Sequence, residues 1–401
     1  MVIGSPEIIE QNDEIEYRVS VESANNTQSL YFLLAGKYRD FIATYCDAPL
    51  VTLLIPAMAQ GEDIFVRGTV SEKLLHNLSG PYQRLLQFIM PQLRLVKIYP
   101  DDTGILHSSS TNVATAFSGG IDASCVLADY YYKNIPESMK ITHLFFHNLG
   151  SHNWFDDNQT LFQKRLERIE SVTRRIGLPL ISVSSNMGVF FKGFSYEQTH
   201  TIRNASVALL LQKGIRRFYY ASGFHYPEVY VGKSLYMGHS DLIGLPLVAT
   251  EAIDTLSVGS EYSRVEKTVI VAGIKESYEW LDVCNHLHNG RFINCSLCGK
   301  CMRTLLTLDI TGHIEKYSKV FDLDLYRKNK TLLIARALAS RNEFCRQITA
   351  YASNTGYSFP LVSYLLFPVF YVLYSFKFIF FPIAKIILRP FPELRRRFWI
   401  Y

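Results

Sequence analysis

Alternating apolar and polar residues near the start of the chain predict a small mixed module. The stretch "EIEYRVSVE" at 14–22 alternates at every position, as a half-buried strand does. Further strands are predicted in "SLYFLLAG", "DIFVRGTV" and "LRLVKIYP", and a helix interrupted at Gly80-Pro81 in "SEKLLHNLSGPYQRLLQFIMPQL". Residues 101–111 then have the polar composition of a linker. We therefore expect an N-terminal α+β module over residues 1–110.

From Asn112 to about residue 250 the pattern changes to short apolar runs that alternate with helical stretches. The runs "NVATAFS", "ITHLFFH" (141–147), "LPLISVSS" (178–185), "RRFYYAS" (216–222) and "LPLVA" (245–249) predict five strands. Strands that alternate with helices form parallel sheets covered by helices on both faces. We therefore predict an α/β fold with a five-stranded parallel sheet, whose ligands would bind at the carboxyl ends of the strands.

Composition narrows the class of protein. The 401 residues are 48% hydrophobic and 19% charged, which excludes a disordered chain. A net charge of +5 is too small to indicate a nucleic-acid partner. The start of the chain lacks the basic and apolar regions of a signal peptide, and four of the seven cysteines fall within 284–301. These features predict a cytoplasmic protein with reduced thiols.

A glycine loop follows the first strand of the predicted sheet. In "SGGIDAS" (118–124), Gly119 and Gly120 let an anion approach the backbone, and the next helix would offer unpaired N–H groups. Ser118 and Ser124 add hydroxyl donors, and Asp122 could bind Mg²⁺ or cap the helix. The simpler alternative is an ordinary strand-to-helix turn.

The loop resembles the PP-loop, S-G-G-x-D-S, of the N-type ATP pyrophosphatases, which cleave ATP between the α- and β-phosphates. It departs from that pattern at Ala123, where the family usually has a second serine. Other nucleotide motifs are absent from the sequence. "VGKS" (231–234) has Pro227 where a Walker loop needs glycine, and no G-x-G-x-x-G follows a strand.

A second motif groups four cysteines with the spacing C-x10-C-x2-C-x2-C: Cys284, Cys295, Cys298 and Cys301. Four thiolates form a closed tetrahedral site for Zn²⁺, which predicts a structural metal in a C-terminal subregion. An iron–sulfur cluster is the alternative, since it also takes four thiolates. His286 and His288 could replace Cys284 as ligands.

Together the two motifs resemble the 7-cyano-7-deazaguanine synthase family. That resemblance implies an adenine nucleotide alpha-hydrolase-like (HUP) fold, ATP with Mg²⁺, and Zn²⁺ at the cysteines, over a domain spanning 111–310. Arg203 and Asn204 in "IRNASVALLL" and Lys267 in "SRVEKTVIV" match further family segments. The residues that the resemblance assigns to ATP are Ser118, Gly119, Gly120, Ile121, Asp122, Ser124, Arg203, Asn204 and Lys267, with catalytic roles for Ser118, Asp122 and Arg203.

The family's substrate-reading stretch is not matched. Only Tyr226-Pro227-Glu228 corresponds to its Tyr-Pro-Asp-Cys signature, so the deazaguanine substrate is not carried over. His225 and His239 lie in this divergent stretch, where they could act as a base, contact a substrate, or simply cap and pack.

The expected function is that of an ATP-dependent ligase. Such an enzyme adenylates a small-molecule or peptide carboxylate, releases pyrophosphate, and lets an amine or ammonia displace AMP. Two alternatives stay open. One is a PP-loop sulfurtransferase or asparagine-synthetase-like amidotransferase. The other is a non-catalytic, zinc-stabilised nucleotide-binding adaptor at a membrane.

The tail, residues 311–401, is expected to be helical with a hydrophobic segment at 359–388. Residues 359–376 carry no charge, and Lys377, Lys385, Arg389 and Arg395–Arg397 follow. A single membrane span would place the catalytic part and these arginines on opposite sides of the membrane, whereas both are expected in the cytoplasm. Contact with the inner face of the cell membrane through 359–401 is therefore favoured over a span. Burial against the body or in a homodimer is the alternative.

Overall fold

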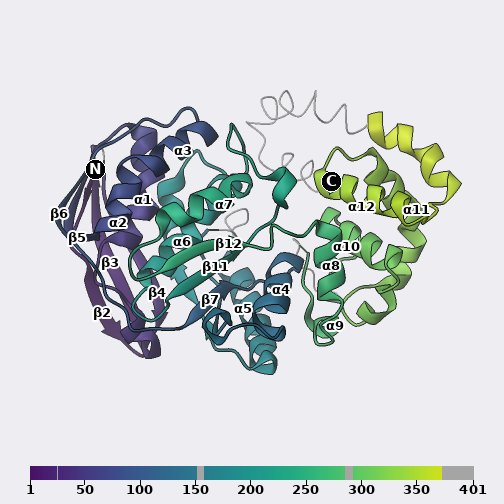
Figure 1. Ribbon diagram of the computed structural model, residues 1–401, viewed down its shortest axis with the longest axis horizontal. Helices are drawn as coiled ribbons and strands as arrows, with labels where there is room; N and C mark the ends of the chain where they lie inside the picture. The colour runs from purple at the N-terminus through teal and green to yellow at the C-terminus, as the bar shows by residue number, and fades with distance from the viewer. Residues whose placement is uncertain (25, 151–157, 285–291, 373–401) are drawn as a thin grey trace. The chain divides into compact units, whose positions relative to one another are not determined.

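The computed structural model describes residues 1–24, 26–150, 158–284 and 292–372. The chain divides into two compact units, Met1–Ser263 and Arg264–Tyr401 (Figure 1). The first unit contains both the predicted N-terminal module and most of the predicted ATP domain. The second contains the cysteine cluster and the helical tail.

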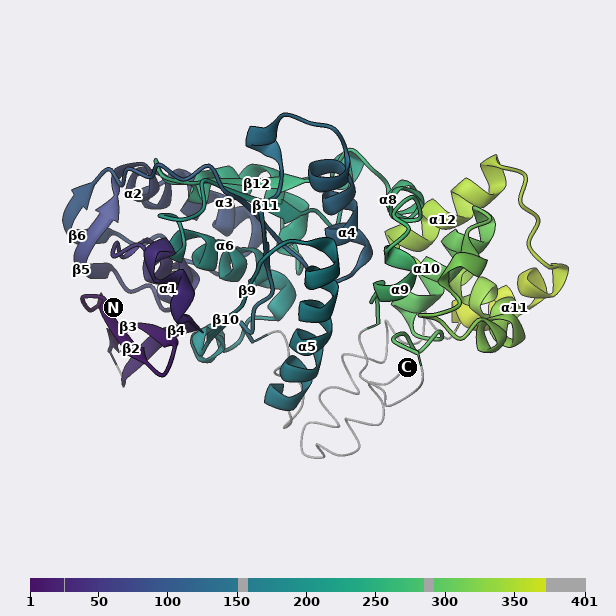
Figure 2. The ribbon, with the colours of Figure 1, turned by 90° about the horizontal axis from the view of Figure 1, so that it is seen from below.

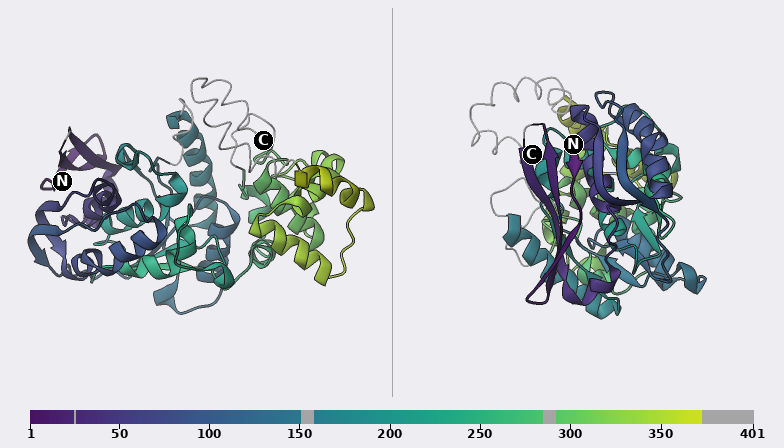
Figure 3. Two further views of the ribbon diagram at one scale, coloured as in Figure 1. Left: turned by 90° about the horizontal axis from the view of Figure 1, so that it is seen from above. Right: turned by 90° about the vertical axis from the view of Figure 1, so that its left-hand side faces the viewer.

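The first unit has a seven-stranded mixed sheet, called sheet A, onto which the right panel of Figure 3 looks. Its longest pair is antiparallel, with Glu14 opposite Ala35 at one end, and this confirms the strand predicted over 14–22. The predicted strand at 93–100 is mostly irregular, because β6 begins only at Ile98. The strands, with order β10-β4-β3-β1-β5-β6 and β2 beside β3, are β1 (Val2–Ile3), β2 (Glu7–Gln11), β3 (Glu14–Ser23), β4 (Asn26–Ala35), β5 (Ile64–Ser71), β6 (Ile98–Gly104) and β10 (Val183–Ser185).

Sheet B confirms the predicted five-stranded parallel sheet. Its strands, in the order β12-β11-β7-β8-β9, are β12 (Asp254–Val258), β11 (Arg217–Ala221), β7 (Val113–Ala116), β8 (His143–Phe145) and β9 (Leu180–Ile181). One predicted strand is wrong: residues 245–249 mostly form a 3-10 helix (Leu245–Val248), and β12 is the fifth strand. Pro246 favours the helical form, because it stands in the first turn of this helix, where a proline fits without a backbone N–H.

The predicted strand at 178–185 divides between the two sheets. β9 pairs with β8 in sheet B, and two residues later β10 pairs antiparallel with β4 in sheet A, with Val183 opposite Leu34. Sheet A therefore contains a strand from outside residues 1–110, and the two sheets are joined through the backbone.

Helices fill the space between the sheets and cover the outer face of sheet B. Helix α1 (Asp47–Gln60) is buried over nearly its whole length, because it packs on β5 of sheet A and on α6 (His200–Leu210), which in turn lies on β11. On the other face α4 (Ile121–Leu127) lies on β7 and β11, with α5 (Asn158–Ile176) beside it (Figure 2). Helices α2 (Glu72–Ser79) and α3 (Pro81–Ile89) confirm the helix broken at Gly80-Pro81.

A buried hydrogen-bond network connects α1 to residues that follow α6. The Asp47 carboxylate accepts the Ser71 N–H at 2.8 Å, the Ser71 hydroxyl at 2.6 Å and the Gln212 amide at 2.7 Å. Gln212 in turn accepts the Thr250 hydroxyl at 2.6 Å. Because buried polar groups are costly without partners, this network fixes how the N-terminal elements pack on sheet B.

The second unit is helical. Its helices are α8 (Arg264–Val271), α9 (Ser277–Trp280), α10 (Gly299–Ile310), α11 (Leu323–Ala339) and α12 (Glu343–Asn354), and residues 361–372 are also helical. Asp322 and Asn342 cap α11 and α12, each accepting a backbone N–H of the first turn. Among the described residues, no helix combines the length and apolarity needed to cross a membrane. Residues 373–388 of the predicted hydrophobic segment, and the basic residues after it, lie outside the described part.

Candidate functional site

The glycine loop lies at the position where open parallel sheets with this order of strands bind their ligands. It follows β7, the central strand, and the chain goes from β7 to β8 and β9 on one side and later to β11 and β12 on the other. The strand order therefore reverses between β7 and β11, and ligand sites in open α/β sheets form at such a point.

The backbone of the loop requires its first glycine. Gly119 has φ of +75°, in the left-handed region that other residues adopt at a cost, and Gly120 is the extended N-cap of α4. Ser118 is exposed at the mouth of the loop, whereas Ile121 is buried as the first residue of the helix. The loop therefore combines a left-handed glycine with one exposed serine.

The second loop hydroxyl is engaged inside the helix. Ser124 is fully buried, and its Oγ donates to the Gly120 carbonyl at 2.7 Å. Ala123 is buried as well. Of the hydroxyls predicted to contact phosphate, only that of Ser118 is exposed.

Asp122 lies in the first turn of α4 and is half-buried. Its negative charge contributes to raising the pKa of Tyr220, at the end of β11, although burial is the largest cause. Asp122, in the helix that follows β7, and Tyr220, in β11, therefore lie within electrostatic range of each other, and β7 and β11 are the two strands between which the order reverses.

Arg203 holds the segment after β8 in place. Its side chain is only 4% exposed, with Nε donating to Thr199 at 2.9 Å and Nη1 to the Leu149 carbonyl at 2.6 Å. The guanidinium also stacks over Phe191, and burial lowers its pKa to about 10. Two of the three guanidinium nitrogens of Arg203 thus form hydrogen bonds within the fold. Asn204, which the resemblance also assigns to ATP, donates to the His200 carbonyl at 2.7 Å.

A polar network that sequence reasoning missed runs from α6 to β11. The Thr201 hydroxyl donates to the buried Asp241 carboxylate at 2.7 Å and lies 3.2 Å from His200 Nδ1, which is 2.6 Å from the Tyr220 hydroxyl. Burial lowers the pKa of His200 to about 4 and raises that of Asp241 to about 7. These residues are distant in the sequence and follow no short motif.

Unsatisfied polar atoms also occur at this edge. His147, just beyond β8, accepts the Val183 N–H at Nδ1, while its buried Nε2 has no hydrogen-bond partner in the described part of the chain. The same holds for the Ser260 hydroxyl, just beyond β12. Buried polar groups without partners are rare and often mark a place where a ligand completes the site.

The two histidines of the divergent stretch stabilise its fold. The His239 ring stacks on Phe224 with 3.7 Å between centroids, and its Nδ1 lies 2.9 Å from the Glu228 carbonyl. His225 Nδ1 lies 3.2 Å from the Glu228 carboxylate. The His239 ring is thus tied to neighbouring residues, whereas His225 Nδ1 forms no hydrogen bond with a described residue.

The four cysteines come together in the second unit as a metal site requires. Their sulfurs lie within 4.8 Å of one another, with Sγ–Sγ distances of 3.9 Å for Cys284–Cys298, 3.8 Å for Cys295–Cys301 and 3.4 Å for Cys298–Cys301. A tetrahedral zinc with bonds of about 2.3 Å would separate its sulfurs by about 3.8 Å. The cluster could therefore hold a metal such as zinc.

The backbone around the cysteines supports the cluster. The Cys298 N–H points at the Cys295 sulfur at 3.3 Å, and Ser296 between them adopts a left-handed φ of +63°. Buried Asn294 bonds to the Val283 N–H and to the Leu281 and Val320 carbonyls, which fixes both flanks. The alternative ligands His286 and His288 lie outside the described residues.

Lys267 lies in the second unit on α8, and its side chain is buried. Its role at a nucleotide stays a prediction from the resemblance.

Comparisons of the chain with protein-family models, with curated proteins and with solved structures found no match. The resemblance to the PP-loop ATP pyrophosphatases therefore rests on the motifs in this chain.

Proposed function

We propose that the first unit binds ATP at the Ser118–Asp122 loop and cleaves it between the α- and β-phosphates. The observation that carries the proposal is the place of the loop, with Gly119 left-handed, at the reversal of strand order in a parallel sheet. Backbone N–H groups at this loop and the Ser118 hydroxyl would hold the leaving pyrophosphate, and Asp122 would hold Mg²⁺.

In the proposed reaction, a carboxylate oxygen of the substrate attacks the α-phosphorus of ATP. The bond between the α-phosphorus and the bridging oxygen breaks, pyrophosphate leaves, and an acyl-adenylate remains. An amine or ammonia then attacks the acyl carbon, and AMP leaves. This chemistry depends mainly on positioning and charge neutralisation. Four thiolates and zinc would stabilise the second unit without taking part.

The test is ATP binding followed by identification of the products. We expect the chain to bind Mg²⁺–ATP in isothermal titration, and Gly119→Ala and Asp122→Ala to weaken binding at least about tenfold. Exposed Asp101→Ala on sheet A is the matched control. Candidate carboxylates should then yield AMP and pyrophosphate. Formation of ADP and phosphate, or undiminished binding by both loop variants, would contradict the proposal.

One observation favours the non-catalytic alternative. Because Ser124 bonds within its helix and Ala123 has no hydroxyl, the loop offers only Ser118 to a phosphate. A nucleotide-binding adaptor would bind ATP with the same dependence on Gly119, yet form no AMP with any carboxylate or amine. Product analysis separates the two functions.

We also propose that the tail contacts an anionic membrane surface. In the helical residues 361–372, large apolar side chains are exposed, including Leu361 at 74% and Leu365 at 69%, and basic residues follow in the sequence. The chain should float with phosphatidylglycerol vesicles, and the double variant Leu365→Asp/Val369→Asp should not. Exposed Asn354→Asp is the control. Equal flotation of all three proteins would contradict the proposal.

A further inference from the structure

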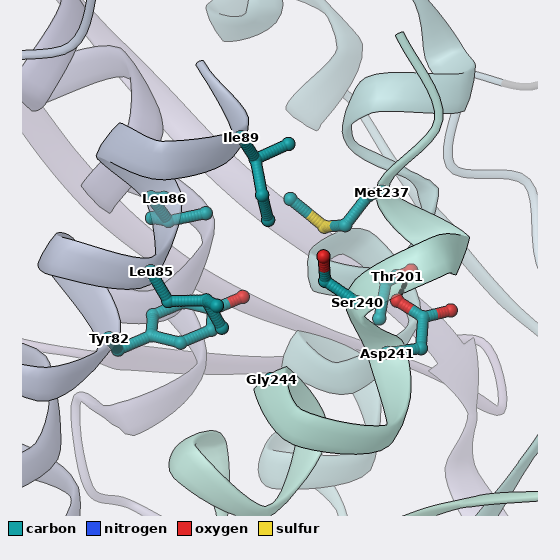
Figure 4. A pocket seen from close by; sticks show the side chains of 9 residues that line it. All are labelled: Tyr82, Leu85, Leu86, Ile89, Thr201, Met237, Ser240, Asp241 and Gly244. Atoms are coloured by element: carbon teal, nitrogen blue, oxygen red, sulfur yellow. Dashed lines mark hydrogen bonds between the residues drawn. The ribbon is translucent and has the colours of Figure 1, made fainter. Parts of the chain in front are cut away.

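A closed loop of the first unit, which follows β11 in the chain, exposes apolar side chains. It runs from Tyr230 to His239, and its ends are held together because the Tyr230 N–H donates to the His239 carbonyl at 3.1 Å. At its base, Met237 lines a small pocket together with Tyr82 and Ile89 of α3 (Figure 4). The base of the loop therefore packs on α3, and we call residues 230–239 the α3 loop.

Hydrogen bonds and ring contacts fix the conformation of the α3 loop. The Ser234 N–H donates to the Ile89 carbonyl at 3.1 Å. The Ser234 hydroxyl donates to the Tyr236 carbonyl at 3.0 Å and accepts the Tyr236 N–H at 3.0 Å. The His239 ring lies 4.7 Å from the Tyr230 ring and 6.5 Å from the Tyr236 ring, centroid to centroid. A loop held in this way has little conformational entropy to lose when it binds a partner.

The side chains that the α3 loop and its flanks expose are almost all apolar. Leu235 is 70% exposed, and Phe88, next to Ile89 at the end of α3, is 63% exposed. The only exposed charged residue between 224 and 244 is Lys233, since Asp241 is buried and the Glu228 side chain is 9% exposed. The exposed residues of this range are Tyr226, Pro227, Tyr230, Val231, Lys233, Leu235, Tyr236 and Ile243. Gathered apolar surface of this kind marks a contact with a partner.

The composition of this surface favours a membrane over a protein as the partner. Protein interfaces are enriched in Arg and depleted in Lys, and Leu and Val are under-represented among the residues that carry most of the binding energy. Here Leu235 and Val231 accompany the tyrosines, and the one exposed cation is Lys233. Tyrosine rings lie at the level of lipid headgroups, aliphatic side chains enter the acyl boundary, and lysine is attracted to anionic headgroups.

We propose that the α3 loop inserts into the interface of an anionic lipid bilayer, with Leu235 and Val231 at the acyl boundary and Lys233 among the headgroups. The first unit then has a membrane contact of its own, in addition to the one proposed for residues 361–372. One shallow contact binds a membrane weakly and reversibly, so stable attachment takes both. The argument for the α3 loop depends neither on ATP cleavage nor on the tail.

Binding of the full chain to vesicles tests the α3 loop. The probe is vesicles of phosphatidylglycerol and phosphatidylcholine in equal parts, at low salt, and the partition coefficient is measured. We expect Leu235→Asp to lower it about tenfold or more, because the burial of a leucine side chain is lost. Lys233→Gln should lower it about fivefold. The control Ile105→Asp makes the same kind of change at another exposed residue of the first unit and should bind as the wild type. All three positions are exposed, so the urea midpoints should match that of the wild type.

Insertion itself is measured by fluorescence. In Leu235→Trp, the signal that remains after subtraction of the wild-type signal should shift to shorter wavelength when vesicles are added, and brominated lipid should quench it. Ile105→Trp should show neither change.

The proposal is overturned if Leu235→Asp binds vesicles as tightly as the wild type, or if the Leu235→Trp signal does not respond to them. A dimer that Leu235→Asp converts to a monomer in gel filtration would also overturn it, because a second copy of the chain would then cover the loop. The tail is judged separately. If Leu365→Asp/Val369→Asp floats like the wild type while Leu235→Asp does not, the tail proposal fails and the membrane contact of the α3 loop stands.

Discussion

Replacing Asp241 by asparagine should stabilise the protein, and by an amount that depends on pH. Burial raises the pKa of Asp241 from its ordinary value of 3.8 to about 7. At ~1.36 kcal/mol per pH unit, ionising this carboxylate in the folded state costs about 4 kcal/mol. The side chain is almost completely buried, so solvent does not reduce this figure. Asparagine keeps the acceptor for Thr201 and removes the charge.

The sign follows from proton binding. Between about pH 4 and 7 the folded state holds a proton on Asp241 that the unfolded state has lost, so this group stabilises the wild type as the pH falls. Above pH 7 the ionisation cost is fully present. The stabilisation of Asp241→Asn over the wild type should therefore be about 2–4 kcal/mol at pH 8 and nearly vanish at pH 4.

The assay is urea unfolding followed by circular dichroism from pH 4 to pH 8. The quantity to compare is the difference in the free energy of unfolding between the wild type and Asp241→Asn, because other groups also titrate in this range. Burial lowers the pKa of His200 to about 4 and that of His147 to about 3. Their contribution has the opposite sign: stability falls as the pH drops below their unfolded values. Both histidines are present in both proteins, as is Tyr82, so their effects largely cancel. A difference that is independent of pH, or a variant less stable at pH 8, would refute the reasoning.

Three further predictions concern packing and metal. Asp47→Ala removes the acceptor of three buried hydrogen bonds and should lower the free energy of unfolding by about 3–5 kcal/mol. Asp40→Ala, at an exposed position, is the control and should change the free energy of unfolding by less than about 0.5 kcal/mol. Equal losses in the two variants would contradict the network. Gly214→Ala places a Cβ 2.0 Å from the Phe41 ring, so the urea midpoint should fall by the equivalent of about 1–3 kcal/mol, and Phe41→Leu should recover part of that loss. Elemental analysis should find about one zinc per chain, whose chelation exposes the four thiols to a thiol reagent and lowers the melting temperature; full thiol reactivity before chelation would argue against a metal.

The sequence predicted the parts of the fold that depend on local pattern. Alternation over 14–22 and the apolar runs of sheet B lie close to the observed strands. Helix α1 was missed because it has no polar face: it is buried between sheet A and α6, so its residues show no period, and Pro49 and Pro56 are typical helix breakers. The strand β12 was missed for the opposite reason. Asp254, Thr255 and Ser257 make it more polar than the apolar runs from which the other strands of sheet B were predicted, and it lies at the edge of the sheet.

The candidate sites show the same difference between features that follow from local sequence and features that follow from the packing of the fold. The glycine loop and the two C-x2-C turns are contiguous, so their residues were found from spacing alone, and the four sulfurs do meet. By contrast, Tyr82 and Asp241 line one small pocket although they lie about 160 positions apart, and no one-dimensional pattern connects them. Arg203 shows the limit most plainly. A motif can place an arginine at the right helix, but only the fold shows that Thr199 and Leu149 occupy two of its nitrogens.

The alanine in the glycine loop gives a final prediction, because its burial argues that the missing hydroxyl was not a phosphate contact in this chain. Ala123 is 6% exposed, so a serine there would bury its hydroxyl and require an internal acceptor, as Ser124 finds at the Gly120 carbonyl. We expect Ala123→Ser to lower the free energy of unfolding by about 1 kcal/mol and to leave ATP affinity within about a factor of two. Ser124→Ala, which removes a hydroxyl already engaged in the helix, should likewise leave ATP affinity unchanged. Titration of both variants with Mg²⁺–ATP decides the matter. A tenfold gain in affinity for Ala123→Ser, about 1.4 kcal/mol, would show instead that a hydroxyl at this position reaches the nucleotide.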